Sequence, residues 1–212
     1  MIENPYDPTF DPMTVPQYQY MSPDHLGGHE NKTHVDAGAL KYMMDNFKAK
    51  SMIDVGCGPG GQVKLAEHAG MEAYGIDGDE NLMIQNILEF DDLRFYLHDF
   101  TMGEAYIEWG KTFDFAWCCE FLEHVEEQYM DNYFVVFQKC LRVVCTHALP
   151  GQGGHHHVNC QEPDYWKAKF KSYGFEFNKK ATEEIRQAST MEKPFLKRSG
   201  LVFDNKKVNH ER

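Results

Sequence analysis

The sequence has little positive charge. It holds 21 Lys and Arg residues against 33 Asp and Glu residues, which gives a formal net charge of −12. A protein that binds nucleic acid broadly needs a basic surface for the phosphate backbone, so this balance disfavours that class. Residues 161–212 are an exception, because they hold 12 basic and 8 acidic side chains. A solvated surface with some asymmetry explains this local excess more simply than a basic binding site.

The sequence also lacks the cysteine spacings of a disulfide or zinc scaffold. No two cysteines form a C-x-x-C pair, and the adjacent Cys118 and Cys119 are poor disulfide partners. The six cysteines are Cys57, Cys118, Cys119, Cys140, Cys145 and Cys160. This usage indicates reduced thiols and predicts a cytoplasmic protein.

Long hydrophobic runs are missing as well. The most apolar stretch, "YFVVFQKCLRVVCTHALP", is broken by Lys139 and Arg142, so no membrane span is expected. The opening "MIENPYDPTF" lacks the basic and apolar regions of a signal peptide. We therefore expect a soluble chain with no membrane partner, and its 212 residues fit one domain.

The sequence does contain a regular alternation of strand and helix patterns. Short apolar runs bounded by turn residues predict strands at 51–56, 71–77, 93–100, 113–120, 142–150, 175–178 and 200–205. Amphipathic segments predict helices at 33–47, 61–70, 78–90, 103–109, 126–141 and 162–174, with Thr33 as the N-cap of the first. The alternation predicts a doubly wound, Rossmann-like α/β fold: a seven-stranded, mostly parallel sheet with helices on both faces.

The first 33 residues differ from the rest. Five prolines between residues 5 and 23 exclude a long helix, so residues 1–33 are expected to form an irregular arm or lid before a single domain at 34–212. Four aromatic side chains of this arm suit a lid over a small bound molecule and equally suit a packed N-terminal arm: Tyr6, Phe10, Tyr18 and Tyr20.

The glycine loop "DVGCGPGG" is the sharpest signal in the sequence. Gly56, Gly58 and Gly60 form G-x-G-x-G, while Gly61 in the third place gives G-x-G-x-x-G. Both patterns let backbone approach a ligand closely, so the glycines alone do not separate a methyl-donor site from a dinucleotide site. Asp77, about twenty residues on, is placed for the ribose hydroxyls that both cofactors carry.

Three other features separate the two cofactors. Asp54 lies two residues before the first glycine, where an acid suits an ammonium group better than a pyrophosphate. Asp99 follows the third strand, where it can accept a hydrogen bond from an adenine amino group. The fourth strand ends in "CCE", which would face a methionine moiety.

With these residues the sequence resembles the class I S-adenosylmethionine-dependent methyltransferases. The motifs "IDVGCGPGG", "AYGIDGD", "LHDF" and "FDFAWCCEFLEHV" occur in family order and spacing over roughly residues 34–178. The resemblance implies a methyltransferase that uses S-adenosyl-L-methionine and releases S-adenosyl-L-homocysteine. The implied cofactor-binding residues are Asp54, Gly56, Cys57, Gly58, Gly60, Asp77, Gly78, Asp99, Phe100, Cys118 and Glu120.

The stretch "CEFLEHV" concerns the acceptor side. It resembles the E-x-x-E-H stretch of methyltransferases that act on quinone precursors and related phenols. It also resembles that of enzymes that methylate the 2′-hydroxyl at the 3′ end of small RNAs, in which a later histidine completes a divalent-metal site. The set implied here is Glu120, Glu123, His124 and His157, which suits Mg, Mn, Fe or Zn.

The role of this set stays open at the sequence level. The residues hold a metal, or His124 with His157 acts as a metal-free catalytic base, or the residues only support the fold. The acceptor expected first is a small molecule, methylated on oxygen or nitrogen. The alternatives are an RNA 3′-terminal 2′-O-methyltransferase with a divalent metal, a non-catalytic S-adenosylmethionine-binding module, and an NAD-dependent enzyme.

Overall fold

The computed structural model describes residues 23–107 and 111–208, so most of the expected arm, including its four aromatic residues, lies outside the described residues. A seven-stranded sheet runs through the molecule in the order β3-β2-β1-β4-β5-β7-β6. All neighbouring strands are parallel except those that β7 makes with β5 and β6. Its strands are β1 (Ser51–Val55), β2 (Glu72–Asp77), β3 (Phe95–Leu97), β4 (Phe115–Cys118), β5 (Arg142–Cys145), β6 (Phe175–Phe177) and β7 (Leu201–Asn205).

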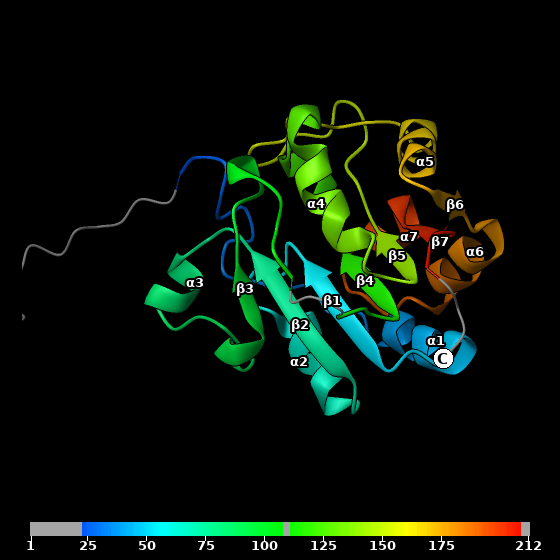
Figure 1. Ribbon diagram of the computed structural model, residues 1–212, viewed down its shortest axis with the longest axis horizontal. Helices are drawn as coiled ribbons and strands as arrows, with labels where there is room; N and C mark the ends of the chain where they lie inside the picture. Colours follow the sequence, from blue (N-terminus) through cyan, green and yellow to red (C-terminus); the bar gives the residue numbers. More distant parts are fainter. Residues whose placement is uncertain (1–22, 108–110, 209–212) are drawn as a thin grey trace, which may run out of the picture.

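Helices cover both faces of this sheet, as the sequence predicts (Figure 1). The longer ones are α1 (Ala37–Phe47), α2 (Gly61–His68), α4 (Met130–Phe137), α5 (Pro163–Ser172) and α6 (Lys179–Ala188), with short α3 (Asn81–Ile84) and α7 (Phe195–Ser199). Single 3-10 turns are η1 (Asp92–Arg94), η2 (Phe100–Met102), η3 (Leu122–His124) and η4 (Glu127–Tyr129). None of the described helices combines the length and the apolar character that crossing a bilayer requires.

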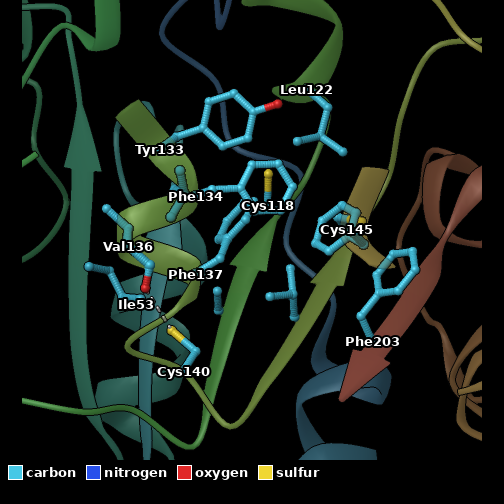
Figure 2. Packing of buried hydrophobic residues seen from close by; sticks show 14 of the residues in the cluster. Ile53, Cys118, Leu122, Tyr133, Phe134, Val136, Phe137, Cys140, Cys145 and Phe203 are labelled. Atoms are coloured by element: carbon cyan, nitrogen blue, oxygen red, sulfur yellow. Dashed lines mark hydrogen bonds between the residues drawn. The ribbon is translucent and has the colours of Figure 1, made fainter. Parts of the chain in front are cut away.

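Each face of the sheet has its own hydrophobic core. Neighbouring residues of a strand point to opposite faces, so Cys118 of β4 packs with α4 and α5 while Trp117 packs with α1, α2, α6 and α7. Figure 2 shows the first core, with Cys118 and Cys145 on neighbouring strands among the rings of α4. Both cysteines are fully buried, and all six cysteines are free thiols.

The first helix begins later than predicted. Its N-cap is Asp36, whose carboxylate accepts from the Ala39 N–H, and the expected cap Thr33 instead accepts from the Gly61 N–H at 3.1 Å. The Thr33 hydroxyl therefore joins the chain before α1 to the start of α2.

Two predicted helices differ in the structure. The segment expected to be helical over 78–90 forms only α3, because the chain turns back at Asn86 (φ +53°) and brings Phe90 onto Gly60. The prediction of a helix over 103–109 is wrong for residues 103–107, which have no regular secondary structure. Conversely, α6 and α7 were not predicted.

Candidate functional site

A cavity of about 370 Å³ opens at the carboxyl ends of β1, β2, β3 and β4. Ligands of doubly wound sheets bind at this edge. Nine of the eleven predicted cofactor residues line the cavity: Asp54, Gly56, Cys57, Gly58, Asp77, Gly78, Asp99, Phe100 and Glu120. The structure therefore brings together residues that are spread over 67 positions of sequence.

Three glycines of the loop have backbone conformations that other residues rarely adopt. Gly56, Gly58 and Gly60 have φ of +75°, +50° and +84°, and a β-carbon on Gly56 would lie 2.4 Å from the Phe121 ring. Gly60 does not line the cavity, because it faces Phe90 on the other side of the loop. Gly60 therefore allows the loop to pack against Phe90 and does not form part of the cavity surface.

Asp54 and Asp77 form the acidic floor of the cavity. Asp77 accepts from the Gly58 N–H at 2.8 Å and the Asp79 N–H at 3.0 Å, so its carboxylate is fixed beside the glycine loop. Burial raises the pKa of Asp77. Burial, and then the charge of Asp77, raise the pKa of Asp54 well above its usual range. A bound ammonium group would offset the cost of ionising Asp54 in this position.

Asp99 lies at the end of the cavity beside β3. One carboxylate oxygen accepts from the Thr101 N–H and hydroxyl, both at 2.8 Å, and the other lies 2.8 Å from His25 Nε2. Partial burial raises the pKa of Asp99, but these hydrogen bonds outweigh it and hold the pKa below its usual value. Asp99 is therefore a carboxylate that accepts hydrogen bonds.

One residue that was predicted to bind the cofactor lies elsewhere in the structure. Cys118 was expected to face the cofactor, but its side chain is fully buried between β4 and α4 and does not line the cavity. Trp117 and Cys119, its neighbours on either side, line the cavity instead. Strand alternation explains the difference, because adjacent residues point to opposite faces.

Glu120 has an unusual backbone conformation for a residue with a side chain, with φ of +52°. Thr146, just after β5, holds it in place: the Thr146 Oγ1 accepts from the Glu120 N–H at 2.7 Å and donates to Glu120 Oε1 at 2.8 Å. Arg198 of α7 lies 3.6 Å from the other carboxylate oxygen. Positive φ in such a residue is a form of strain that often occurs at functional sites.

Glu123, His124 and His157 form a cluster beside the cavity, which the two histidines line. One ligand atom from each lies within 4.8 Å of the others, and no further group of this kind occurs among residues 23–107 and 111–208. Glu123 is fully buried and neither carboxylate oxygen has a hydrogen-bond partner. Because buried polar atoms are normally partnered, the two oxygens fit a metal ion. Glu120, expected as a fourth ligand, lies outside the cluster and is held by Thr146 and Arg198.

The ionisation of the cluster fits a metal site as well. Burial, and then the charge of Glu120, raise the pKa of Glu123 to about 8. Burial, and then His157, lower the pKa of His124 to about 4. His157 Nδ1 lies 3.0 Å from the Gln152 carbonyl oxygen, so Nδ1 carries the proton and Nε2 carries a lone pair. Neutral imidazoles with free lone pairs are the form that binds cations.

Backbone hydrogen bonds bring His157 to this place. The N–H groups of Val158 and Asn159 donate to the Glu123 carbonyl oxygen at 2.9 and 3.0 Å. Gly154 also permits the close approach, because a β-carbon there would lie 2.2 Å from His157 Nε2. In the sequence alone, Gly154 indicates only a loop.

Residues 25–34, which precede α1, form part of the cavity wall, and we call them the strap. All of them except Asn31 line the cavity. His25 contacts Asp99, and His29 Nε2 lies 3.1 Å from Asp79 Oδ2. The sequence predicts an arm or lid over residues 1–33 but not these contacts of the strap. Thr146 and α7 were not predicted either, because each acts through a contact distant in sequence.

A family model matches somewhat less than half of the chain, 96 of its 212 residues. Residues 53–148 match the family model described as a methyltransferase domain. No curated protein sequence matches the chain.

Several solved structures share the fold. The methyltransferase domain of the bacterial CtHen1 is 16% identical, with a TM-score of 0.53 over 79% of this chain and 95% of that chain. A TehB-like S-adenosylmethionine-dependent methyltransferase from Corynebacterium glutamicum is 16% identical, with a TM-score of 0.54 over 80% and 88%. Human N-acetylserotonin methyltransferase, crystallised with S-adenosylmethionine, is 13% identical, with a TM-score of 0.52 over 79% and 50%. At these identities the likeness concerns the fold.

Proposed function

We propose that this chain is a class I S-adenosylmethionine-dependent methyltransferase and that it methylates a hydroxyl group of a small molecule. The observation that carries the choice of acceptor is Glu123, whose two buried oxygens have no partner and face two histidines. Hydroxyl acceptors need a base or a metal to remove their proton, whereas neutral amines do not. A dedicated cation site therefore favours oxygen over nitrogen.

The donor side needs positioning more than chemistry. S-adenosylmethionine would supply a methyl group on a sulfonium, and in-line attack on that methyl carbon would break its bond to sulfur and release S-adenosylhomocysteine. For the protein we propose that Asp77 binds the ribose hydroxyls, that Asp99 accepts from the adenine amino group, and that Asp54 binds the ammonium group. These residues hold the donor against the glycine loop and keep water away from the reacting carbon.

On the acceptor side Glu123, His124 and His157 would hold a divalent cation. Such a cation lowers the pKa of a hydroxyl that binds it. The alternative, His124 as a metal-free base, has less support, because a pKa of about 4 makes a poor base at neutral pH. Glu120 remains close enough to the cluster to raise the pKa of Glu123, and we propose that it positions the acceptor rather than the cation.

The second candidate is the 2′-hydroxyl at the 3′ end of an RNA. The same cluster supports it, and the resemblance of "CEFLEHV" implies it. The net charge of −12 counts against it, because an RNA acceptor brings a phosphate backbone to the surface.

Metal analysis of the purified protein tests the proposal. Wild-type protein loaded with Mn²⁺ and desalted should retain about one ion per chain, and Glu123→Gln should retain none, since an amide is a weak ligand. Glu176→Gln, on an exposed part of β6, is the matched control and should retain the ion. Full retention by Glu123→Gln would contradict the metal site.

Turnover assays then separate the acceptors. Methyl transfer from labelled S-adenosylmethionine to a panel of phenols and catechols, dependent on Mn²⁺ or Mg²⁺, supports the proposal. Transfer to a 3′-terminal RNA hydroxyl alone supports the second candidate. Donor binding without transfer to either would indicate a non-catalytic module.

A further inference from the structure

The strap follows the donor site along its whole length. At one end His25 contacts Asp99, and Leu26 packs on Gly78, where a β-carbon would lie 2.8 Å from the Leu26 side chain. In the middle the β-carbon of His29 packs on Gly58. At the other end Thr33 accepts from the Gly61 N–H at the first residue of α2. The strap thus runs from the adenine end, past the glycine loop, to the end where the methionine group is expected.

Charged side chains are distributed unevenly along the part of the cavity that the strap covers. The residues that line the methionine end include Asp54 and Glu120, both acidic. The amino-acid part of the donor carries an ammonium group, which these acids suit, and also a carboxylate, which they repel. Arg198 does not line the cavity and is engaged with Glu120. Asp54 and Glu120 thus offer the donor carboxylate no positive charge, and a cation from another element would complete this end of the cavity.

Lys32 is the cationic side chain that the strap brings to the cavity. Among the described residues that line the cavity, it is the only lysine or arginine. It stands directly before Thr33, which is tied to the start of α2, and its own N–H donates to the His29 carbonyl oxygen at 2.9 Å. Thr33 and His29 both contact the glycine loop or the start of α2, so the backbone of Lys32 is held on that side of the cavity. The Lys32 side chain is exposed and long enough to follow a bound ligand.

We propose that the strap is the roof of the donor site and that Lys32 is the counter-ion of the donor carboxylate. In this role Lys32 selects ligands with an intact amino-acid group over nucleosides without one. The inference rests on the donor site and not on the acceptor or metal proposed above.

Two ligands separate this role from a structural one. S-adenosylhomocysteine carries the carboxylate, whereas 5′-methylthioadenosine keeps the adenosine and the thioether but lacks the amino-acid group. Isothermal titration measures both for wild type, Lys32→Met and Lys32→Arg. Methionine keeps the length and apolar stem of the side chain, and arginine keeps the charge.

We expect Lys32→Met to weaken S-adenosylhomocysteine binding by about fivefold, the upper range for a solvent-accessible ion pair, and to leave methylthioadenosine unchanged. Lys32→Arg should restore binding of S-adenosylhomocysteine. The control is Lys64→Met on α2, where Lys64 lies 3.9 Å from Glu89 and outside the cavity, and it should change neither ligand.

Two results would overturn the inference. Equal weakening of both ligands by Lys32→Met would mean that Lys32 only supports the strap. Unchanged binding of S-adenosylhomocysteine would mean that the carboxylate is bound by other groups. If wild-type protein bound neither ligand, the assignment of the cavity as a donor site would be wrong. This outcome differs from the other two because it appears in the wild-type protein and not only in Lys32→Met.

Discussion

Glu123 combines a buried position with a pKa of about 8, which has a direct consequence for cation binding. At pH 6 to 8 the carboxyl of the metal-free protein is mainly protonated, and a cation has to displace that proton. His124, with a pKa of about 4, is already neutral in this range and releases none. We therefore expect the Kd for Mn²⁺ to fall about tenfold per pH unit up to about pH 8 and to level off above it.

Isothermal titration in buffers of different ionisation enthalpy checks both parts of this expectation. About one proton should be released per Mn²⁺ bound at pH 6.5. A Kd that stays constant between pH 6 and pH 8 would show that Glu123 is ionised without the cation.

Thr146 is the residue on which the conformation of Glu120 depends. Thr146→Val removes the hydroxyl that accepts from the Glu120 N–H and donates to its carboxylate, at nearly constant volume. We expect a loss of about 1–3 kcal/mol in the free energy of unfolding, because buried polar groups lose their partners. Chemical denaturation measures it. Thr146→Ser keeps the hydroxyl and should recover most of the loss, and equal losses in the two variants would argue against the hydrogen bonds as the cause.

The residues at strand ends show what sequence reasoning can reach. Asp54, Asp77 and Asp99 each lie within two residues of the carboxyl end of a strand, and parallel strands bring such ends to one edge of a sheet. Cys118 was misplaced because β4 is buried on both faces. Its sequence therefore has no alternation of polar and apolar residues to reveal which side chains face the cavity.

Among the elements, α1 depends most on a single side chain. Asp36 is fully buried, and it accepts from the N–H groups of Ala39 and Thr190 at 2.9 Å and from the Ser189 hydroxyl. It therefore both caps α1 and ties it to the segment after α6. Asp36→Ala should lower the free energy of unfolding by about 2–4 kcal/mol.

The comparison for this prediction is Asp36→Asn, which keeps one acceptor oxygen and should cost less. Thermal and urea unfolding both measure the difference. A loss below about 1 kcal/mol in Asp36→Ala would mean that water replaces the carboxylate.

Element prediction failed where the deciding contacts are distant. The sequence of α6 is mostly polar, and the helix has only Ala181, Thr182 and Ile185 buried against the sheet. Thr33 is a good N-cap type, but Asp36 took the position because Thr190 and Ser189 reach it from more than 150 residues away. Neither fact is present in a local window of sequence.

On the scale of the whole molecule, donor binding should stabilise the fold. A ligand that binds only the folded state at 100 times its Kd adds about 2.7 kcal/mol, which for a chain of this size raises Tm by about 5–10 °C. S-adenosylhomocysteine should give this shift in differential scanning fluorimetry. NAD at the same concentration should give none, and a shift with NAD alone would overturn the donor assignment.

The strand order has a consequence for how the chain folds as it is made. β6 joins the sheet only through β7, which comes later in sequence but lies between β5 and β6. The Phe170 ring of α5 likewise stacks on Phe203 of β7, at 3.9 Å between centroids. On the ribosome, α5 and β6 therefore emerge before the strand that shelters them, and at roughly 5–20 residues/s they wait about 1–5 s. During that interval the Phe170 ring lacks the Phe203 ring that stacks on it in the folded protein, so we expect this part of the nascent chain to be prone to aggregation.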